Sequence, residues 1–390
     1  MMNKIAVIGT AGVPARYGGF ETLAHNLVGQ LSKRYELHVY CSTDGYAKEE
    51  RTEEFNGAKL HYVPFKANGI QSIIYDVISI FHALKYADTL LILGVPGCAL
   101  LPFVRLFTGK RIIVNIDGLE WKRDKWNAAA KAFLRFSEFM AVKFAHTIVA
   151  DNKAIQEHLF DSYGSSSKLI AYGADHAKNE VLTRTDLTKY PFLRHSYAFK
   201  VCRIEPENNI RMVLKAFSEM PSKHLVIVGN WNTSEYGKET RTLYGSFPNI
   251  HLLDPIYDQK TLDSLRSNCY VYLHGHSAGG TNPSLVEAMT LGLPIISFGV
   301  NYNKYTTENQ AMYFMNSDEI KEVVITTPFL KYVEVGDAMQ RIARTRYTWK
   351  VVSQQYAQCF DLAITPSKEA TSKRMNTTRT ISGSTLSPTA

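Results

Sequence analysis

The sequence lacks paired cysteines and long hydrophobic runs. Its five cysteines are odd in number, far apart and without zinc-ligand spacing, so we predict buried free thiols in a reducing compartment and no structural metal. The longest uncharged apolar run, Thr89 to Val104, contains glycines and prolines and is shorter than the roughly 20 residues of a spanning helix. The first residues enter a strand without the apolar stretch of a secretion signal. We therefore expect a cytoplasmic protein.

The chain also lacks a strong charge of one sign. Lys and Arg number 44 against 36 Asp and Glu, and the apolar fraction of 45% is typical of globular proteins. A length of 390 residues favours two domains. The net charge of +8 suits an anionic ligand, an acidic membrane surface or nucleic acid. Nucleic acid is the least favoured of the three, because the basic residues form no continuous patch interleaved with aromatic ones.

Strands and helices alternate through the first half. A strand over 4–9, a glycine-containing loop, a helix with leucines at four-residue spacing from about Phe20 and a strand over 37–41 form a βαβ opening. Such an opening is typical of a doubly wound parallel sheet. Further strands are predicted over 61–65, 89–93, 111–116, 146–150 and 168–172.

The first loop carries a candidate anion site. Gly18 and Gly19 present bare backbone at the start of the helix, with Glu21 one turn further on. A flexible loop that needs glycine for its turn fits these residues equally well. A nicotinamide-binding fingerprint is a poor match, because Gly9 and Gly12 are wrongly spaced for it.

A polar segment, 117–126, follows the strand over 111–116. Open α/β sheets bind their ligands at the carboxyl ends of strands, so Asp117 is a candidate site residue. An aspartate before a glycine is also a turn signal, and a loop-capping role fits as well.

One helix is predicted over 126–146. Its apolar stripe is interpreted either as core or, because basic residues lie beside it, as a surface that rests on an anionic membrane. The stripe comprises Trp126, Ala130, Phe133, Phe136, Met140 and Phe144.

The second half begins after a polar, irregular stretch, 175–195. We predict domains over 1–180 and 181–345, a helix over 346–364 and a disordered tail over 365–390, which is rich in Ser and Thr. Strands of a second doubly wound sheet are predicted over 197–202, 224–229, 249–253, 270–273, 294–298 and 311–314.

The most informative segment runs from His274 to Met289. A buried strand leads into a loop with Gly279 and Gly280, and Asn282 followed by Pro283 predicts an N-cap and the first residue of a helix. The free amides and the dipole of that helix end favour a bound anion, above all phosphate. Glu287, on the second turn, can reach back towards a ligand hydroxyl. An ordinary strand-to-helix turn with a surface glutamate is the alternative.

Four motifs carry a family resemblance: Arg16-Tyr-Gly-Gly-Phe-Glu-Thr22, Asp117-Gly-Leu-Glu-Trp-Lys-Arg123, Cys202-Arg-Ile-Glu-Pro-Glu-Asn-Asn209 and His274-Gly-His-Ser-Ala-Gly-Gly-Thr-Asn-Pro-Ser284. They resemble family 4 glycosyltransferases of the GT-B fold over about residues 4 to 362, and within that family the bacterial rhamnosyltransferases that build surface polysaccharide. The resemblance implies an α/β protein with two Rossmann-like doubly wound domains facing across a cleft. It also implies that the helix containing Trp349 crosses back to the first domain.

The resemblance further implies a retaining transfer from dTDP-rhamnose to a lipid-linked or saccharide acceptor, at the cytoplasmic face of the inner membrane, with no metal or other cofactor. A UDP- or GDP-sugar is the alternative donor. Two positions depart from the family pattern. Gly279 stands where the first glutamate of an E-x7-E pair is usual, with Glu287 as the second, and Asn208 replaces a phosphate-binding lysine.

Roles follow from the resemblance. Arg203 and the helix amides would stabilise the departing diphosphate, Glu287 would accept a ribose hydroxyl, and Asp117 would contact the acceptor or the oxocarbenium ion. The catalytic candidates are Asp117, Arg203 and Glu287; the donor-binding candidates are Gly18, Gly19, Arg203, Asn208, Gly280, Thr281, Asn282 and Glu287; the acceptor-side candidates are Arg16, Tyr17, Glu21, Glu120 and Trp121.

Other classes remain open at this point. Arg203 could be a surface ion-pair partner, which would contribute little. The missing glutamate and lysine also fit a sugar-nucleotide-binding protein without activity, and the α/β pattern fits a dinucleotide-dependent oxidoreductase.

Overall fold

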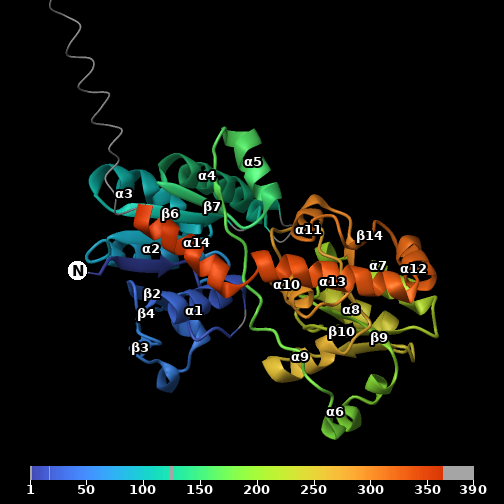
Figure 1. Ribbon diagram of the computed structural model, residues 1–390. Coiled ribbons are helices and arrows are strands. Elements are labelled where there is room, and N and C mark those ends of the chain that lie inside the picture. The colour runs from blue at the N-terminus through green and yellow to red at the C-terminus, as the bar shows by residue number, and fades with distance from the viewer. Residues whose placement is uncertain (1, 17, 117, 123–125, 363–390) are drawn as a thin grey trace, which may run out of the picture.

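The computed structural model describes residues 2–16, 18–116, 118–122 and 126–362. Two α/β units lie side by side and are joined by a long helical segment that runs across both of them, coloured orange to red in Figure 1. The first sheet has the strand order β3-β4-β2-β1-β5-β6-β7-β8, and the second has the order β11-β10-β9-β12-β13-β14. All pairings are parallel except that of β3 with β4.

The elements of the first unit are β1 (Lys4–Ile8), α1 (Gly19–Leu31), β2 (Glu36–Ser42), η1 (Thr43–Gly45), η2 (Lys48–Glu50), β3 (Glu54–Phe55), β4 (Ala58–Val63), α2 (Gln71–Ala83), β5 (Thr89–Leu93), η3 (Pro96–Leu100), α3 (Leu101–Phe107), β6 (Arg111–Ile116), η4 (Glu120–Lys122), α4 (Ala128–Phe144), β7 (Thr147–Ala150), α5 (Lys153–Tyr163) and β8 (Lys168–Leu169).

The connection and the second unit comprise α6 (Arg184–Lys189), η5 (Pro191–Arg194), β9 (Tyr197–Val201), η6 (Pro206–Asn208), α7 (Ile210–Ser218), β10 (His224–Val228), α8 (Glu235–Tyr244), β11 (Ile250–Leu253), α9 (Gln259–Ser267), β12 (Val271–His274), α10 (Pro283–Thr290), β13 (Ile295–Phe298), α11 (Asn301–Thr306), β14 (Met312–Phe314), α12 (Ser317–Thr326), α13 (Phe329–Arg346) and α14 (Trp349–Leu362).

Helices cover both faces of each sheet, which is why the strands read as continuous apolar runs. In β1, Ile5 and Val7 face α1 and α14, whereas Ala6 and Ile8 face α2, α3 and α4. The second sheet is covered by α7 and α12 on one face and by α9, α10 and α13 on the other. The predicted strands are confirmed, although the last strand of the first unit is limited to Lys168–Leu169.

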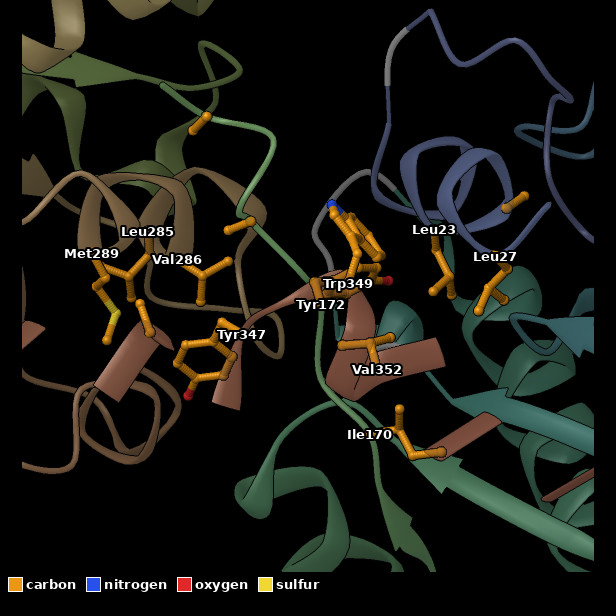
Figure 2. Close-up of a cluster of buried hydrophobic side chains, with 14 of the residues drawn as sticks. Leu23, Leu27, Ile170, Tyr172, Leu285, Val286, Met289, Tyr347, Trp349 and Val352 are labelled. Atoms are coloured by element: carbon orange, nitrogen blue, oxygen red, sulfur yellow. The ribbon is translucent and has the colours of Figure 1, made fainter. Parts of the chain in front are cut away.

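The helix α14 returns to the first unit and packs against α1. The Tyr35 hydroxyl donates to Asp361 Oδ1 at 2.7 Å, and Asn115 Nδ2 donates to the Tyr356 hydroxyl at 2.7 Å. One apolar cluster runs through both units, with Trp349 lying beside Tyr172 at its centre (Figure 2). The predicted fold class, two facing doubly wound units and a helix that crosses back, is confirmed.

The helix predicted over 126–146 is present, and its apolar stripe is partly covered by the protein. The helix α4 begins and ends two residues inside the predicted range and buries Leu134, Ser137, Glu138 and Ala141, which lie beside the predicted stripe. Phe136 of that stripe is 51% exposed. Trp126 and Phe144 of the stripe pack against the core of the first unit, so the stripe is part of the core at its two ends and open to solvent at Phe136.

Three further predictions can be compared with the structure. The five cysteines are free, and all except the half-buried Cys202 are buried, as expected. Across the described ranges, every helix is too short or too polar to span a bilayer. Tyr17, Asp117 and the tail over 365–390 lie outside the described residues.

Candidate functional site

The two glycine loops predicted to form a site lie against each other. A methyl group placed on Gly19 would lie 3.5 Å from Pro283 Cγ, at the start of α10 in the other unit. Gly118, which follows β6, approaches Gly279 so closely that a methyl group on it would lie 3.4 Å from Gly279 Cα. The carboxyl ends of the strands of both sheets therefore meet at this junction.

The local geometry of α10 follows the sequence signals. Asn282 is the N-cap, and its side-chain oxygen accepts from the Ser284 amide at 3.0 Å; Pro283 is the first helical residue. Gly279 has a φ of 129°, a region that side-chain-bearing residues rarely adopt. The family's usual glutamate would be strained at this position, which gives a physical reason for the glycine.

Asp151 of the first unit lies at the N-terminus of α10. Its Oδ2 accepts from the Thr281 amide at 2.8 Å, and the Thr281 hydroxyl donates to the Asp151 carbonyl oxygen at 2.6 Å. A methyl group on Gly280 would collide with the same carboxylate. Asn152 adds a bond from Nδ2 to Thr306 Oγ1 at 3.1 Å. The Thr281 amide was predicted to bind the nucleotide-sugar. In the structure it donates its hydrogen bond to a protein carboxylate instead.

Two side chains from elsewhere in the chain, Arg266 and His176, bind the Glu287 carboxylate. Arg266, whose side chain is fully buried, binds its Oε2, and His176 Nε2 lies 3.1 Å from its Oε1. His176 Nδ1 accepts from Trp349 Nε1 at 3.1 Å, so His176 Nε2 carries the proton towards Glu287. Burial alone would raise the pKa of Glu287, but Arg266 and His176 outweigh it and hold the pKa at about 2.

Arg203 lies on an exposed turn that is bonded to the loop before α10. The Asn208 side chain donates to the Arg203 carbonyl oxygen at 2.7 Å, and the Ser277 amide donates to the Glu207 carbonyl oxygen at 2.9 Å. Among the described residues, the Arg203 guanidinium makes no ion pair or hydrogen bond. Asn208 therefore acts in the turn's own structure, while Arg203 remains available to a ligand.

A buried lysine lies beneath the same loop. Lys200 projects from β9, is 1% exposed, and its Nζ would lie 2.8 Å from a methyl group on Gly275. Within the described part of the chain, the Lys200 ammonium has no hydrogen-bond partner. Burial lowers the pKa of Lys200, and burial together with Lys200 lowers the pKa of His274. The charged form of a buried lysine without a hydrogen-bond partner is costly.

The acceptor-side candidates of the first loop occupy different positions. Arg16 pairs with Glu50 at 2.7 Å on the surface and lies 4.9 Å from the centre of the Tyr46 ring. Glu21 points inward, where its Oε1 accepts from the Ala11 amide at 2.6 Å. Glu21 therefore shapes the loop from inside.

Glu120 and Trp121 form the other acceptor-side group, on η4. Glu120 accepts from Trp126 Nε1 at 3.1 Å, and Trp121 Nε1 donates to Glu138 Oε2 of α4 at 3.0 Å. Arg135 of α4 lies over the Trp121 ring at 5.2 Å. This segment is consequently tied to α4.

Several of these residues carried no usable sequence signal. Arg266 and His176 are distant from Glu287 in the chain and lie in segments without a motif. Lys200 lies inside an apolar strand, where a charged residue is unusual, and this anomaly could have identified it. The residues that the structure describes contain no cluster of three or more His, Cys, Asp or Glu side chains arranged to hold a metal.

The fold and the paired loops can now be compared with known proteins. Residues 189–322 match the family described as glycosyl transferases group 1, and residues 2–175 match a domain of unknown function, DUF1972. The chain is a glycosyltransferase with the GT-B fold. A search of curated protein sequences found no match.

Solved structures share this fold at low identity. Sucrose-phosphate synthase from Thermosynechococcus elongatus superimposes with a TM-score of 0.75 and 13% identity, over 93% of this chain and 99% of that one. Anabaena HepE in complex with UDP-glucose gives 0.70 and 15%, over 93% and 100%. An E. coli structure described as trehalose-6-phosphate bound with UDP-2-fluoro glucose gives 0.69 and 9%, over 92% and 99%.

Proposed function

We propose that this protein transfers a sugar from a nucleotide-sugar donor to a lipid-linked or saccharide acceptor, with retention of configuration. The supporting observation is the junction of the two glycine loops beside two basic side chains that have no hydrogen-bond or ion-pair partner among the described residues, Arg203 on the surface and Lys200 beneath the loop. Two similar folds were solved with UDP-glucose or UDP-2-fluoro glucose, which supports a donor of this class.

In the proposed reaction, the charge that develops on the leaving diphosphate is stabilised by the protein. Arg203 contacts the phosphates directly, and Lys200 adds a fixed positive field from below, in the place of the lysine that Asn208 replaces. Gly280 and Gly19 bring bare backbone close to the ligand from the two units. Such preorganised electrostatic stabilisation is usually the largest contribution to catalysis, and with these cations the proposal requires no metal.

Glu287 is proposed to accept a hydrogen bond from a ribose hydroxyl of the nucleotide. A carboxylate has about four lone-pair positions, and His176 and Arg266 use one at each oxygen. Those two contacts keep Glu287 ionised and fixed in direction. The role of Asp117 towards the acceptor or the oxocarbenium ion stays a proposal from the motif.

The proposed donor is dTDP-rhamnose, with surface-polysaccharide synthesis at the cytoplasmic face of the membrane as the setting. The motifs quoted above support this choice over a UDP- or GDP-sugar. The test incubates the full chain with dTDP-rhamnose, UDP-glucose or GDP-mannose and a lipid-linked glycan extract. Mass spectrometry identifies the product, and NMR of its anomeric centre reports retention or inversion.

We expect a product from dTDP-rhamnose that Arg203→Ala abolishes, whereas the equally exposed Arg184→Ala retains it. Product from UDP-glucose alone would show that the donor is not dTDP-rhamnose, while the protein would still be a glycosyltransferase. Nucleotide binding without product from any acceptor would favour a sugar-nucleotide-binding protein without activity. This alternative is supported by the hydrogen bond that the Thr281 amide already donates to Asp151.

A further inference from the structure

The helices on one face of the first sheet expose large apolar side chains to solvent. Eight residues, each at least 39% exposed, belong to this set, and Leu106 and Phe107 reach 70% and 72%. We name this surface the apolar flank; it comprises Ile74, Ile78 and Phe81 of α2, Phe103, Leu106 and Phe107 of α3, and Phe136 and Phe139 of α4.

The apolar flank crosses from helix to helix. The ring centroids of Phe81 and Phe103 are 6.1 Å apart, and those of Phe103 and Phe107 are 5.1 Å apart, which links α2 to α3. The helices α3 and α4 pack against each other and lie together on one side of the first unit (Figure 1). Exposed apolar patches that extend over several elements are typical of interaction sites.

The exposed charges of these three helices are all positive. Arg105, Arg135 and Lys143 are exposed, whereas the acidic side chains of the same helices, Asp76 and Glu138, are each 1% exposed. Lys143 Nζ lies 5.7 Å from the centroid of the Phe139 ring, so the cations border the aromatic side chains. Aromatic residues rimmed by cations complement an anionic lipid surface.

Buried hydrogen bonds of Glu138 orient α4 so that Phe136 and Phe139 are exposed. Glu138 accepts from Trp121 Nε1 at 3.0 Å, from His158 Nε2 at 2.9 Å and from the Tyr163 hydroxyl at 2.8 Å. This buried network fixes the polar stripe of the helix against the protein. The hydrogen bond between Trp121 and Glu138 connects α4, which carries part of the apolar flank, to the acceptor-side segment.

We propose that the apolar flank docks on the surface of an anionic lipid bilayer, with its aromatic and aliphatic side chains in the headgroup region. The helices lie flat along the membrane, because they pack lengthwise on the sheet, and the η4 segment comes to the lipid surface beside them. A lipid-linked acceptor would then enter the cleft from the bilayer. The delivery of a lipid-linked acceptor rests on the proposed function. The docking on a bilayer follows from the apolar flank alone.

Vesicle flotation of the full chain tests this proposal. We expect binding to vesicles of phosphatidylcholine with phosphatidylglycerol and little binding to phosphatidylcholine alone, with loss at high salt. L106S/F107S should weaken binding about tenfold or more, because it removes inserted apolar area. The matched control F329S/L330S, equally apolar and exposed on α13, should bind like the wild type.

A second variant tests the charges and keeps every apolar side chain of the flank. R135Q/K143Q should weaken binding to anionic vesicles by roughly 25-fold, since each of the two cations near the surface adds about fivefold. The exposed cations of the other unit, in K215Q/K331Q, should have no effect. Equal binding of all four variants and the wild type would overturn the proposal. So would a dimer in solution that L106S/F107S dissociates, without vesicle binding by the wild type.

The melting shift caused by nucleoside diphosphates, measured on the same variants without vesicles, separates this proposal from the proposed function. A shift in every variant, with vesicle binding lost only in the flank variants, supports both. Vesicle binding without any nucleotide-induced shift in melting temperature would support the docking surface and contradict the proposed nucleotide-sugar donor.

Discussion

Asp151 and Thr281 join the two units at the N-terminus of α10, where the Thr281 amide donates to Asp151 Oδ2 at 2.8 Å. The position is one at which free amides and the helix dipole favour an anion. A carboxylate of the first unit accepts from this amide, so the contact links the two units at the candidate site.

Loss of this contact should destabilise the protein. Asp151→Ala leaves the buried Thr281 amide without its acceptor, and we expect a loss of about 1–3 kcal/mol in the free energy of unfolding. Gly280→Ala should also destabilise, because the new methyl group meets the Asp151 carboxylate. Denaturant unfolding of both variants and of the double variant measures the coupling.

The double variant should lose less stability than the sum of the single losses, since the collision is absent when residue 151 is alanine. Gly29→Ala is the control, because a methyl group there meets no atom within 4 Å, and it should stabilise by roughly 0.5–1 kcal/mol. Additive losses would show that Gly280 and Asp151 do not interact in this way.

Glu287 should make the protein sensitive to acid. Its pKa is about 2 in the folded state, below its ordinary value of 4.5, so it contributes stability that is complete above about pH 4.5 and declines as the pH falls towards 2. Glu287→Gln should flatten this part of the profile. It should also lower stability at pH 7 by about 1–3 kcal/mol, because the buried Arg266 loses one of its two carboxylate partners and keeps Asp263. Chemical unfolding from pH 6 to pH 2.5 measures both effects.

Two histidine stacks predict a second, milder pH dependence. His38 Nδ1 lies 2.9 Å from His61 Nε2 in the first unit, and His224 Nδ1 lies 3.2 Å from His251 Nε2 in the second. Burial and the neighbouring histidines lower the pKa of His61 and of His251 to about 4 from 6.5. Stability should be complete above about pH 6.5 and fall between pH 6.5 and 4.

Thermal melts from pH 7.5 to 4.5 should show this decline in the wild type. In H61Q/H251Q the melting temperature should depend less on pH over the same interval. Curves that fall in parallel would assign the decline to other groups.

Lys200 is predicted to weaken the fold and strengthen donor binding. Lys200→Met should raise the melting temperature, because it replaces an unpaired buried cation with an apolar side chain of similar length. The affinity for a nucleoside diphosphate, measured by calorimetry, should fall about tenfold, as expected for one lost charge interaction. Lys215→Met, on the surface of α7, should change neither. Unchanged affinity in Lys200→Met would exclude the residue from the site.

The sequence was sufficient for features that depend on local chemistry. The apolar runs predicted the strands, and Asn282 with Pro283 predicted the start of α10, because strand burial and helix capping are set by neighbouring residues. The partners of Glu287 were not predictable, since Arg266 and His176 reach it only through the packing of α9 and the connection between the units.

The helix α4 shows a different limit. Its periodicity revealed an apolar stripe but could not tell which face is covered. Glu138 accepts from three donors of η4 and α5, so a face that combines Leu134 and Ala141 with Ser137 and Glu138 is buried, whereas Phe136 and Phe139 are exposed. Such a reversal depends on tertiary hydrogen bonds that no periodicity records.

The most direct test of the central proposal is nucleotide binding at the junction of the two loops. Melting temperatures of the full chain are measured with dTDP, UDP, GDP and NAD, for the wild type and Arg203→Ala. We predict a rise with dTDP that exceeds the rise with UDP and GDP, and that Arg203→Ala removes. A rise with NAD alone, or a dTDP rise that Arg203→Ala retains in full, would contradict the proposed donor site.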